Sequence, residues 1–300
     1  MSVKVGIALG GGGARGVAHF GVLKALEQEG IPIDRISGTS IGALVGAMYA
    51  QNPDADFLIE RFKQSLDEAF YDKLGVGYLK TSGARDGSFF HQATQNIKRQ
   101  IVLNIAQSRK ALIKEVRLRD VLLKFIEEGD IENTKIPLGV IATSLHTGDD
   151  VVYTKGDIIS AVAASCSIPG FLSPVCVEDD LLADGGVSCP VPVKVLMGMG
   201  ADVTIGVEIC MRRYHPLQNL NIIEIIARAE MITSQRLAEM MVDTADVAIC
   251  PDTKDVYWSE FSRADELIEA GIAAARERLG AIREAVRKKT PWYKRIFIGK

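Results

Sequence analysis

Ser40 stands at the centre of a short motif that is typical of nucleophilic serines. Residues 38–42 read Gly-Thr-Ser-Ile-Gly, which matches the pattern G-x-S-x-G. Residues 33–37, which precede the motif, are predicted to form a strand, and a run of small apolar residues from 41 onward predicts a buried helix. Glycines at 38 and 42 remove the Cβ atoms that would clash in a sharp strand-to-helix turn. We therefore predict that Ser40 is a nucleophile supported by Gly38 and Gly42; the alternative is a serine that only caps the helix.

A second glycine-rich segment, at 10–16, follows an apolar run at 3–9 that predicts the first strand. It satisfies G-x-G-x-x-G, the pattern of dinucleotide-binding loops, which also need an acidic residue at the end of the second strand. The candidate, Asp34, precedes the apolar part of that strand, whose end is occupied by the Ser40 motif. The same glycines at a helix N-terminus could instead direct several backbone N–H groups toward a developing oxyanion. The loop by itself is compatible with both interpretations.

A serine nucleophile needs a group that accepts its proton. The chain has only four histidines, His19, His91, His146 and His215, and no clear acidic partner stands beside His215. Only His215 comes late enough for the usual order of an α/β-hydrolase; we expect a structural role for His19 and surface positions for the other two. Asp184 is the better candidate base, because an apolar run at 181–183 leads directly into Asp-Gly-Gly. Burial would raise the pKa of its carboxyl group from about 4 toward a useful range.

The elements that must position these residues alternate in the order strand, loop, helix, strand, turn, helix. This order predicts an α/β domain with a mostly parallel sheet. Later strands are predicted at 138–142, 151–153, 181–183, 203–207 and 247–249, and a helix that packs into the core is predicted at 219–242. We expect one domain over residues 1–280, with a helical, cap-like excursion at about 55–128, followed by a basic, aromatic tail at 281–300.

The composition excludes several classes of protein. A formal net charge of −3 disfavours nucleic acid as a partner, because binding phosphates needs a concentrated excess of Lys and Arg. The five cysteines are scattered and form neither a disulfide framework nor a metal site. The longest apolar stretch, at 41–50, is about half the length needed to span a bilayer. We expect a cytoplasmic protein that needs neither metal nor cofactor.

Taken together, four motifs in order resemble those of the bacterial patatin-like phospholipases. They are the glycine loop at 10–16, the G-T-S-x-G elbow, an A-S-x-x-x-P block at 164–169 and the Asp-Gly-Gly motif at 184–186. The resemblance implies a three-layer patatin-like fold with a mostly parallel central sheet and helices on both faces. The sequence departs from the family pattern in the length and charge of residues 95–128, so the resemblance does not locate the cap or the substrate entrance.

The resemblance also implies a catalytic dyad of Ser40 and Asp184. Ser40 would attack an ester carbonyl and Asp184 would accept its proton, without metal or cofactor. The implied oxyanion donors are the backbone N–H groups of Gly11, Gly12 and Gly13, and the implied supporting residues are Arg15, Gly38, Gly42, Gly185 and Gly186. The expected function is a serine acyl hydrolase of the esterase, phospholipase A or lysophospholipase type. The alternative is a non-catalytic regulatory or adaptor protein on the same fold, and intact Ser40 and Asp184 count against it.

The C-terminal run at 283–300 is basic and aromatic. It holds seven Lys or Arg residues against one acidic residue, with Trp292, Tyr293, Ile296 and Phe297 interleaved. Cations beside interfacial aromatics are attracted to an anionic membrane surface, although a frayed basic tail is the alternative. We therefore expect lipid or an acyl ester as substrate and a peripheral contact with the inner face of the membrane through this tail. The sequence gives no indication of the oligomeric state.

Overall fold

A mixed sheet of eight strands is the centre of the computed structural model, which describes residues 3–66, 115–209, 214, 217, 222–254, 256, 257 and 260–290. The strands are β1 (Val5–Leu9), β2 (Arg35–Thr39), β3 (Leu138–Ser144), β4 (Asp150–Tyr153), β5 (Val175–Val177), β6 (Asp180–Asp184), β7 (Val203–Val207) and β8 (Val247–Ile249). Their order is β5-β6-β3-β2-β1-β7-β8, and β4 also pairs with β3.

Five neighbouring strands, β3, β2, β1, β7 and β8, are parallel to one another. Of the remaining strands, β4 and β6 pair with β3 in antiparallel fashion, and β5 pairs antiparallel with β6. All five residues of β1 and of β7 are buried, as expected for parallel strands that are covered on both faces. The carboxyl ends of β1, β2 and β7 therefore meet at one edge of the sheet, which is the edge that carries the site.

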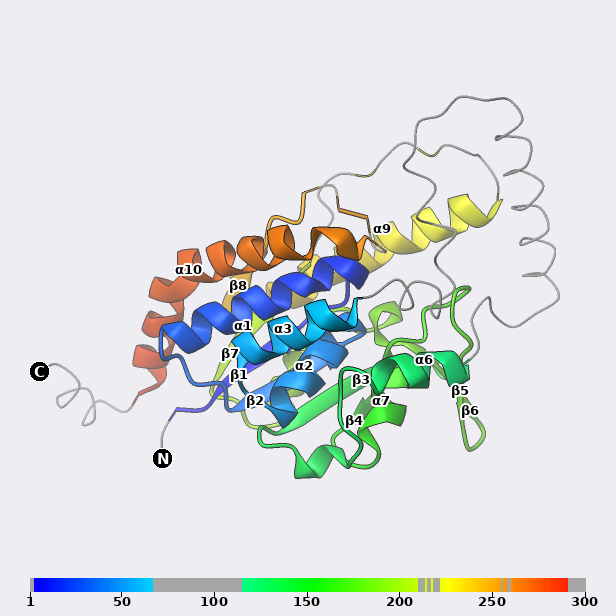
Figure 1. Cartoon of the computed structure of the whole chain (residues 1–300), viewed down its shortest axis with the longest axis horizontal. Coiled ribbons are helices and arrows are strands. Elements are labelled where there is room, and N and C mark those ends of the chain that lie inside the picture. Colours follow the sequence, from blue (N-terminus) through cyan, green and yellow to red (C-terminus); the bar gives the residue numbers. More distant parts are fainter. Residues whose placement is uncertain are drawn as a thin grey trace, which may run out of the picture.

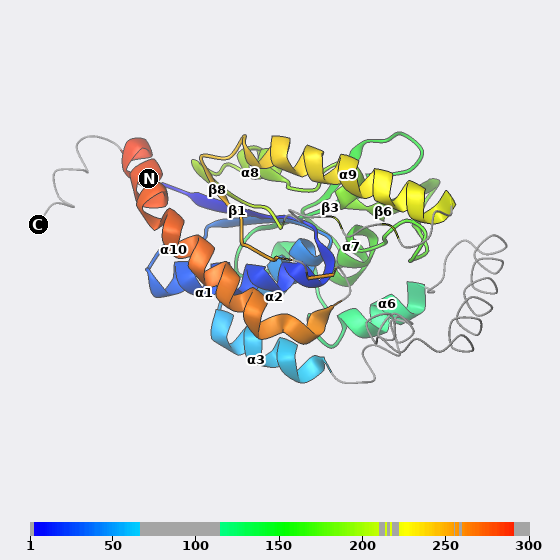
Figure 2. The same ribbon diagram turned by 90° about the horizontal axis from the view of Figure 1, so that it is seen from above.

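Helices cover both faces of the sheet, so the expected three-layer fold is confirmed (Figures 1 and 2). One layer holds α1 (Ala18–Gln28), α2 (Ile41–Gln51), α3 (Ala55–Ser65) and α10 (Ala264–Lys289). The opposite layer holds α8 (Val193–Gly198) and α9 (Ile222–Val242). At the antiparallel side of the sheet, α7 (Ile158–Ser165) packs on β3 and α6 (Glu115–Leu122) packs on α7. Short 3-10 helices lie at Gly13–Val17 (η1), Ile131–Asn133 (η3), Gly185–Val187 (η4) and Phe261–Arg263 (η5).

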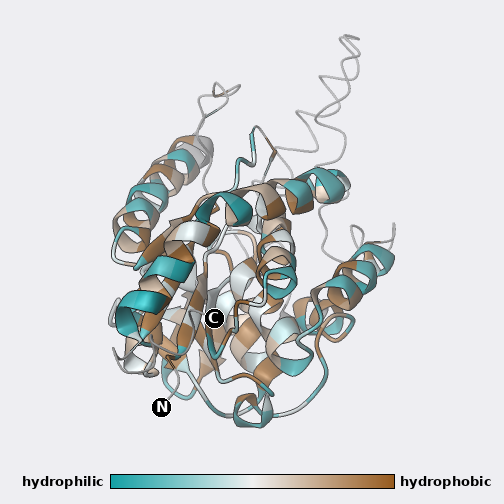
Figure 3. Ribbon diagram, turned by 90° about the vertical axis from the view of Figure 1, so that its left-hand side faces the viewer, coloured by the Kyte–Doolittle hydropathy of each residue, from teal (hydrophilic) through white to brown (hydrophobic). Residues whose placement is uncertain are grey.

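The largest hydrophobic cluster lies between the sheet and the layer of α1 and α2. Every residue of α2 from Ile41 to Ala50 is buried, because this helix lies between the sheet and neighbouring helices. An aromatic group of Phe20, Phe62 and Phe125 continues the core outward, with adjacent ring centroids 5.2 and 5.3 Å apart. Hydrophilic residues are concentrated on the peripheral helices (Figure 3). The apolar character of the segment after Ser40 thus reflects burial on all sides.

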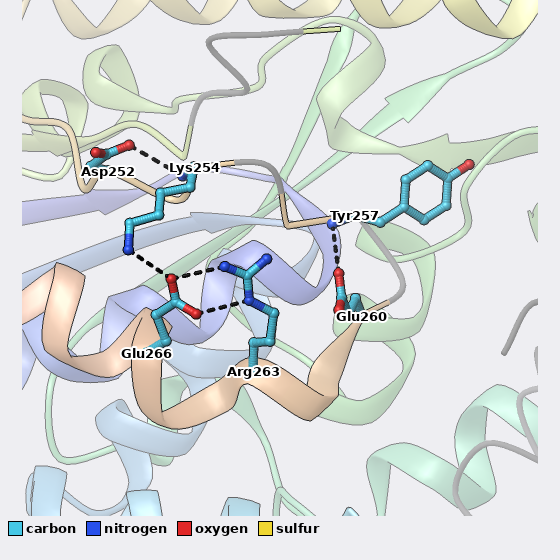
Figure 4. Close-up of polar contacts among 6 residues, drawn as sticks. All are labelled: Asp252, Lys254, Tyr257, Glu260, Arg263 and Glu266. Atoms are coloured by element: carbon cyan, nitrogen blue, oxygen red, sulfur yellow. Dashed lines mark hydrogen bonds and ion pairs between the residues drawn. The ribbon is translucent and has the colours of Figure 1, made fainter. Parts of the chain in front are cut away.

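The connection from β8 to α10 is tied to the first turn of that helix (Figure 4). Glu266 accepts hydrogen bonds from Arg263 Nε and Nη2, both at 2.8 Å, and from Lys254 Nζ at 2.9 Å. These hydrogen bonds, those of Arg263 first, lower the pKa of Glu266 to about 2. Because η5 also contacts η1, the ion pairs brace the side of the molecule next to the glycine loop.

Several expectations at the level of elements need correction. The helix at α9 is only half covered: Ala238 and Val242 are buried, but Ile226 and Met240 are 61% and 69% exposed. A helix on the outer layer buries one face alone, so the expectation of a core helix was wrong. The strand β5 had not been expected. The expected domain boundary at residue 280 falls inside α10, which continues to Lys289.

Two expected segments are described only in part. Within the excursion at 55–128, α3 and α6 are helical, whereas residues 67–114 lie outside the described part of the chain. Residues 291–300 of the expected tail lie outside it as well. In the portions that the structure does describe, no helix combines the length and the apolar character needed to cross a membrane.

Candidate active site

The chain turns sharply at Ser40, between the end of β2 at Thr39 and the start of α2 at Ile41. Ser40 has φ 55° and ψ −125°, a backbone conformation that residues with a side chain rarely adopt. Gly42 makes the turn possible, because a Cβ atom there would lie 2.1 Å from the Leu9 carbonyl oxygen. A Cβ atom on Gly38 would lie 2.4 Å from the carbonyl oxygen of Gly42. The predicted elbow geometry is therefore present, and it lifts the Ser40 side chain above the carboxyl end of the sheet.

Ser40 and Asp184 meet although 144 residues separate them in sequence. The Ser40 hydroxyl donates to Asp184 Oδ2 at 2.5 Å, and the backbone N–H of Gly186 donates to Oδ1 at 2.7 Å. The exposed fraction of the two residues is only 7% and 6%. Burial raises the pKa of Asp184 to about 6, against the hydrogen bonds from Ser40 and Gly186, which lower it; the charge of Glu230 adds to the increase. A carboxylate with this pKa is a stronger base than one in water.

The backbone around both residues is held by buried side chains. Ser165, the last residue of α7, accepts a hydrogen bond from the Ser40 N–H through its hydroxyl oxygen at 2.8 Å. The Ser40 N–H is thus already occupied and is no oxyanion donor in this structure. Thr143 on β3 donates to the Asp184 carbonyl oxygen at 3.0 Å. In the sequence Ser165 is recognisable only as part of the A-S-x-x-x-P block, and no sequence pattern indicates a role for Thr143.

The glycine loop is anchored at one end and open in the middle. Gly10 N–H donates to Val207 O and Gly11 N–H donates to Pro190 O, both at 3.0 Å. Within the described part of the chain, the N–H groups of Gly12 and Gly13 donate to no protein acceptor. Of the three expected oxyanion donors, Gly11 is thus already engaged, and Gly12 and Gly13 stay candidates. Arg15, which is buried, donates from Nε to the Gly12 carbonyl oxygen at 3.1 Å and so supports the loop.

One short segment, Asp184 to Pro192, serves several parts of the site. It begins with the acid, continues through Gly185 and Gly186, and then supplies three carbonyl acceptors. The Pro190 oxygen accepts from Gly11 N. The Cys189 oxygen accepts from Thr39 Oγ1 at 2.8 Å, and the Pro192 oxygen accepts from Ser37 Oγ at 2.9 Å. Gly185 is required here, since a Cβ atom would lie 2.3 Å from the Ile141 carbonyl oxygen. The segment thereby ties the elbow, the glycine loop and the acid together.

The acidic residue that a dinucleotide site would need is elsewhere. Asp34 accepts hydrogen bonds from Lys4 Nζ at 2.8 Å and from Val5 N at 2.9 Å. Both partners lie at the beginning of β1, at the opposite edge of the sheet from the glycine loop, which follows Leu9. A ribose bound at the loop could not reach Asp34, so the geometry disfavours the dinucleotide interpretation.

The histidines that the structure describes are not placed as bases for Ser40. His19 is fully buried and donates from Nε2 to the Gly10 carbonyl oxygen at 2.8 Å, and burial lowers its pKa to about 4. It therefore supports the glycine loop, in line with the structural role expected of it. His146 is exposed and lies 3.5 Å from Asp180. His91 and His215 lie outside the described residues, within which no cluster of His, Cys, Asp and Glu could hold a metal ion.

The family model described as patatin-like phospholipase matches residues 7–197, which include the elbow, the glycine loop and the Asp-Gly-Gly motif. This match covers more than half of the chain. The chain belongs to the patatin-like phospholipase family. The expected family is thereby confirmed, but its restriction to bacteria is not, because the relatives come from bacteria and eukaryotes.

Three relatives illustrate this range. An uncharacterized NTE family protein of Mycobacterium tuberculosis is 33% identical over 210 residues, 69% of this chain and 49% of that protein. A patatin-like phospholipase domain-containing protein of Caenorhabditis elegans is 29% identical over 300 residues, 91% of this chain and 20% of that protein. Lysophospholipase NTE1 of Pyricularia oryzae is 27% identical over 306 residues, 94% of this chain and 19% of that protein. The chain thus spans a fifth to a half of the length of these relatives.

Proposed function

We propose that this patatin-like protein is a serine acyl hydrolase that cleaves carboxylic esters of lipids through a dyad of Ser40 and Asp184. The observation that carries the proposal is the hydrogen bond of 2.5 Å from the Ser40 hydroxyl to Asp184 Oδ2 inside a buried elbow. The family and a lysophospholipase among the relatives support lipid esters, of the phospholipase A or lysophospholipase type, as the substrate class.

The first half of the reaction forms an acyl-enzyme. As Ser40 Oγ attacks the ester carbonyl carbon, its proton passes to Asp184 Oδ2, and the carbonyl oxygen becomes an oxyanion. The proposed donors to that charge are the N–H groups of Gly12 and Gly13 at the start of η1, and the lack of a protein acceptor for either within the described residues supports this assignment. Collapse of this intermediate breaks the bond to the alcohol, which leaves with the proton from Asp184. The carboxylate is then ionised again, and the acyl group is bound to Ser40.

The second half uses the same groups in reverse. Asp184 takes a proton from a water molecule whose oxygen attacks the acyl carbon, and a second oxyanion forms at the same N–H groups. Collapse releases the fatty acid, and the proton on Asp184 returns to Ser40 Oγ. One ester and one water thus give one acid and one alcohol.

A fluorophosphonate probe tests the nucleophile directly. Wild type is expected to become labelled, and Ser40→Ala is expected to remain unlabelled. Hydrolysis of a short acyl ester should fall by a factor on the order of 10⁴ or more in Ser40→Ala and in Asp184→Asn. Loss of either member removes proton transfer or the covalent step outright.

Asp180→Asn is the matched control, because Asp180 begins the strand that Asp184 ends but bonds to Ser144 rather than to Ser40. It should retain hydrolysis within about twofold of wild type. A wild type that is neither labelled nor able to turn over any ester would overturn the proposal and favour an adaptor function on this fold. A panel of diacyl and monoacyl phospholipids then identifies the preferred ester.

A further inference from the structure

Helix α9 touches the turn that orients the acid of the site. Ser234, in the middle of this helix, donates from its hydroxyl to the Gly186 carbonyl oxygen at 3.0 Å. Gly186 is the residue whose N–H donates to Asp184 Oδ1 at 2.7 Å. A continuous path of hydrogen bonds therefore runs from α9 through Gly186 to Asp184 and on to Ser40.

The turn at Gly185–Val187 is fixed at Gly185, whose carbonyl oxygen accepts from Cys189 N at 2.8 Å, whereas the contact with α9 is made at Gly186. Asp184 is held by its strand pairing with Ala142, by Thr143, and by its N–H, which donates to Ser167 O at 2.9 Å. Its side chain instead takes its direction from the Gly186 N–H, which belongs to a short 3-10 turn with an exposed Val187. A glycine in such a turn is free to move unless something fixes it. Ser234 supplies a fixed point from the opposite layer of the molecule.

We propose that Ser234 is a positioning residue for the reaction: by holding Gly186, it keeps the Asp184 carboxylate aimed at the Ser40 hydroxyl. The inference rests on the function proposed above and assigns α9 a part in it. The Ser234 hydroxyl bonds to the Gly186 carbonyl oxygen rather than to the side chain of Ser40 or Asp184. Its effect is to reduce the number of orientations that Asp184 can adopt, which is how groups behind a catalytic side chain contribute to rate.

The groups around Asp184 determine whether a substitution raises or lowers its pKa. The charge of Glu230, one helical turn before Ser234 on the same side of α9, raises the pKa of Asp184, and the charge of Asp184 adds to the rise that burial gives the pKa of Cys166, just after α7. The hydrogen bond from Gly186 N–H favours the ionised carboxylate. A looser turn weakens that bond and so raises the pKa of Asp184, whereas removal of the charge on Glu230 lowers it.

The test compares full-length variants by ester hydrolysis over a range of pH. Ser234→Ala is expected to lower kcat roughly tenfold with KM changed by less than about twofold, and to move the acidic limb of the kcat/KM profile to higher pH. Ser234→Thr keeps a hydroxyl and should restore most of kcat, whereas Ser234→Val, of the same shape, should not. Glu230→Gln should move the acidic limb to lower pH.

Thr233→Ala is the matched control, since Thr233 is the neighbouring residue and, among the residues that the structure describes, its hydroxyl bonds only to Ala229 O of its own helix, at 3.1 Å. It is expected to behave like wild type. The proposal fails if Ser234→Ala matches Thr233→Ala in kcat and in pH profile. It also fails if Thr and Val at 234 are equally impaired, because volume rather than the hydroxyl would then matter. An inactive wild type overturns the proposed function instead, so the two failures are distinguishable.

Discussion

At the scale of single residues, the site contains a strained backbone conformation and a buried acid, both of which are energetically unfavourable and need support from neighbouring residues. Ser40 has a positive φ, and Asp184 is a carboxylate that is almost completely removed from water. Each is stabilised by named contacts: Ser165 accepts from the Ser40 N–H, and Gly186 donates to the acid. Such local conflict is expected at functional positions, where geometry matters more than stability.

The titration of Asp184 predicts an acidic limit to the reaction. Only the ionised carboxylate can accept the Ser40 proton, and its pKa is raised to about 6. The kcat/KM for ester hydrolysis should therefore be constant above about pH 7 and fall about tenfold per pH unit below about pH 6. A pH profile of kcat/KM measures this directly. An acidic limb near pH 4 would contradict this prediction, because it would mean that burial does not raise the pKa of Asp184.

The same shift predicts that the acid lowers the stability of the fold. Its pKa is about 6 in the folded protein against an ordinary value of 3.8, so the ionised folded form is disfavoured above pH 6. This difference corresponds to roughly 3 kcal/mol, which disappears as the pH falls from about 6 to 4. Asp184→Asn should be inactive yet more stable than wild type by about 1–3 kcal/mol at pH 8, and the gap should narrow at pH 4. Urea unfolding of both proteins at the two pH values checks this, and Asp180→Asn should show no such gap.

The sequence predicted the residues that have a local signature and missed those that act from a distance. Ser40 and Asp184 lie in motifs with glycines whose spacing reflects a sharp turn, so their positions could be found without a structure. Ser234 lies in no motif, and Ser165 was noted only as part of the A-S-x-x-x-P block, because the roles of both come from pairing with residues 48 and 125 positions away. The hydrogen bond from Gly11 N–H to the Pro190 carbonyl oxygen could not be predicted either, because every residue has a backbone carbonyl and its partner does not depend on residue type.

At the scale of elements, the closest helix pair is α1 with α10, and two glycines allow it. A Cβ atom on Gly21 would lie 1.9 Å from Ile268 O, and one on Gly271 would lie 2.0 Å from Ala18 O. The two backbones are therefore nearly in contact at this crossing. Because α1 directly follows η1, the packing of α10 also fixes the base of the glycine loop.

Alanine substitutions at two glycines of α10 should distinguish the glycine at the helix crossing from one that lies away from it. Gly271→Ala is expected to lower the free energy of unfolding by about 3 kcal/mol or more, because neither backbone can move away without disturbing the core. Gly280→Ala, in the same helix with nothing within 4 Å of the added methyl, should instead raise it by about 0.5–1 kcal/mol. Denaturant unfolding of both variants measures the two effects. Equal effects would show that the crossing is looser than the structure indicates.

Strands with strong patterns were predicted within a few residues, and weak ones were not. The runs at 203–207 and 247–249 coincide with β7 and β8, because strands buried on both faces read as continuous apolar segments. Strand β5 has three residues, two of them exposed, at the edge of the sheet, so its sequence lacks both length and periodicity. Helix α9 was misjudged because its composition is apolar, although only one side of it finds a partner.

At the scale of the whole molecule, the basic C-terminal run is partly neutralised. Arg283 pairs with Glu29 at 2.7 Å, and Arg287 pairs with Glu284 at 2.7 Å, so these two cations are engaged within the fold. Residues 281–289 are the end of α10 rather than a tail. Lys288 also lies 3.9 Å from Glu284, so the proposed contact with an anionic membrane depends chiefly on Lys289 and on the basic and aromatic residues at 291–300.

Removal of residues 291–300 tests that contact while leaving α10 intact. Three cations are lost, each worth about 1 kcal/mol near an anionic surface, so binding to phosphatidylserine-containing vesicles at low salt should weaken roughly 100-fold. Vesicle co-sedimentation measures the change, and hydrolysis of a soluble short-chain ester should be unaffected. Binding that equals that of the full chain would remove the tail from the proposal.

The segment from Asp184 to Pro192 also determines when the site can exist during synthesis. Its partners at Ser37, Thr39 and Ser40 lie 144 to 155 residues earlier in the chain. The proposed nucleophile therefore leaves the ribosome long before its proposed base, and contacts of such separation form late in folding. A chain that ends before residue 184 has the serine and the glycine loop but neither the acid nor the carbonyls that hold them. Unfinished and truncated products of this protein are accordingly expected to be inert toward the lipids around them.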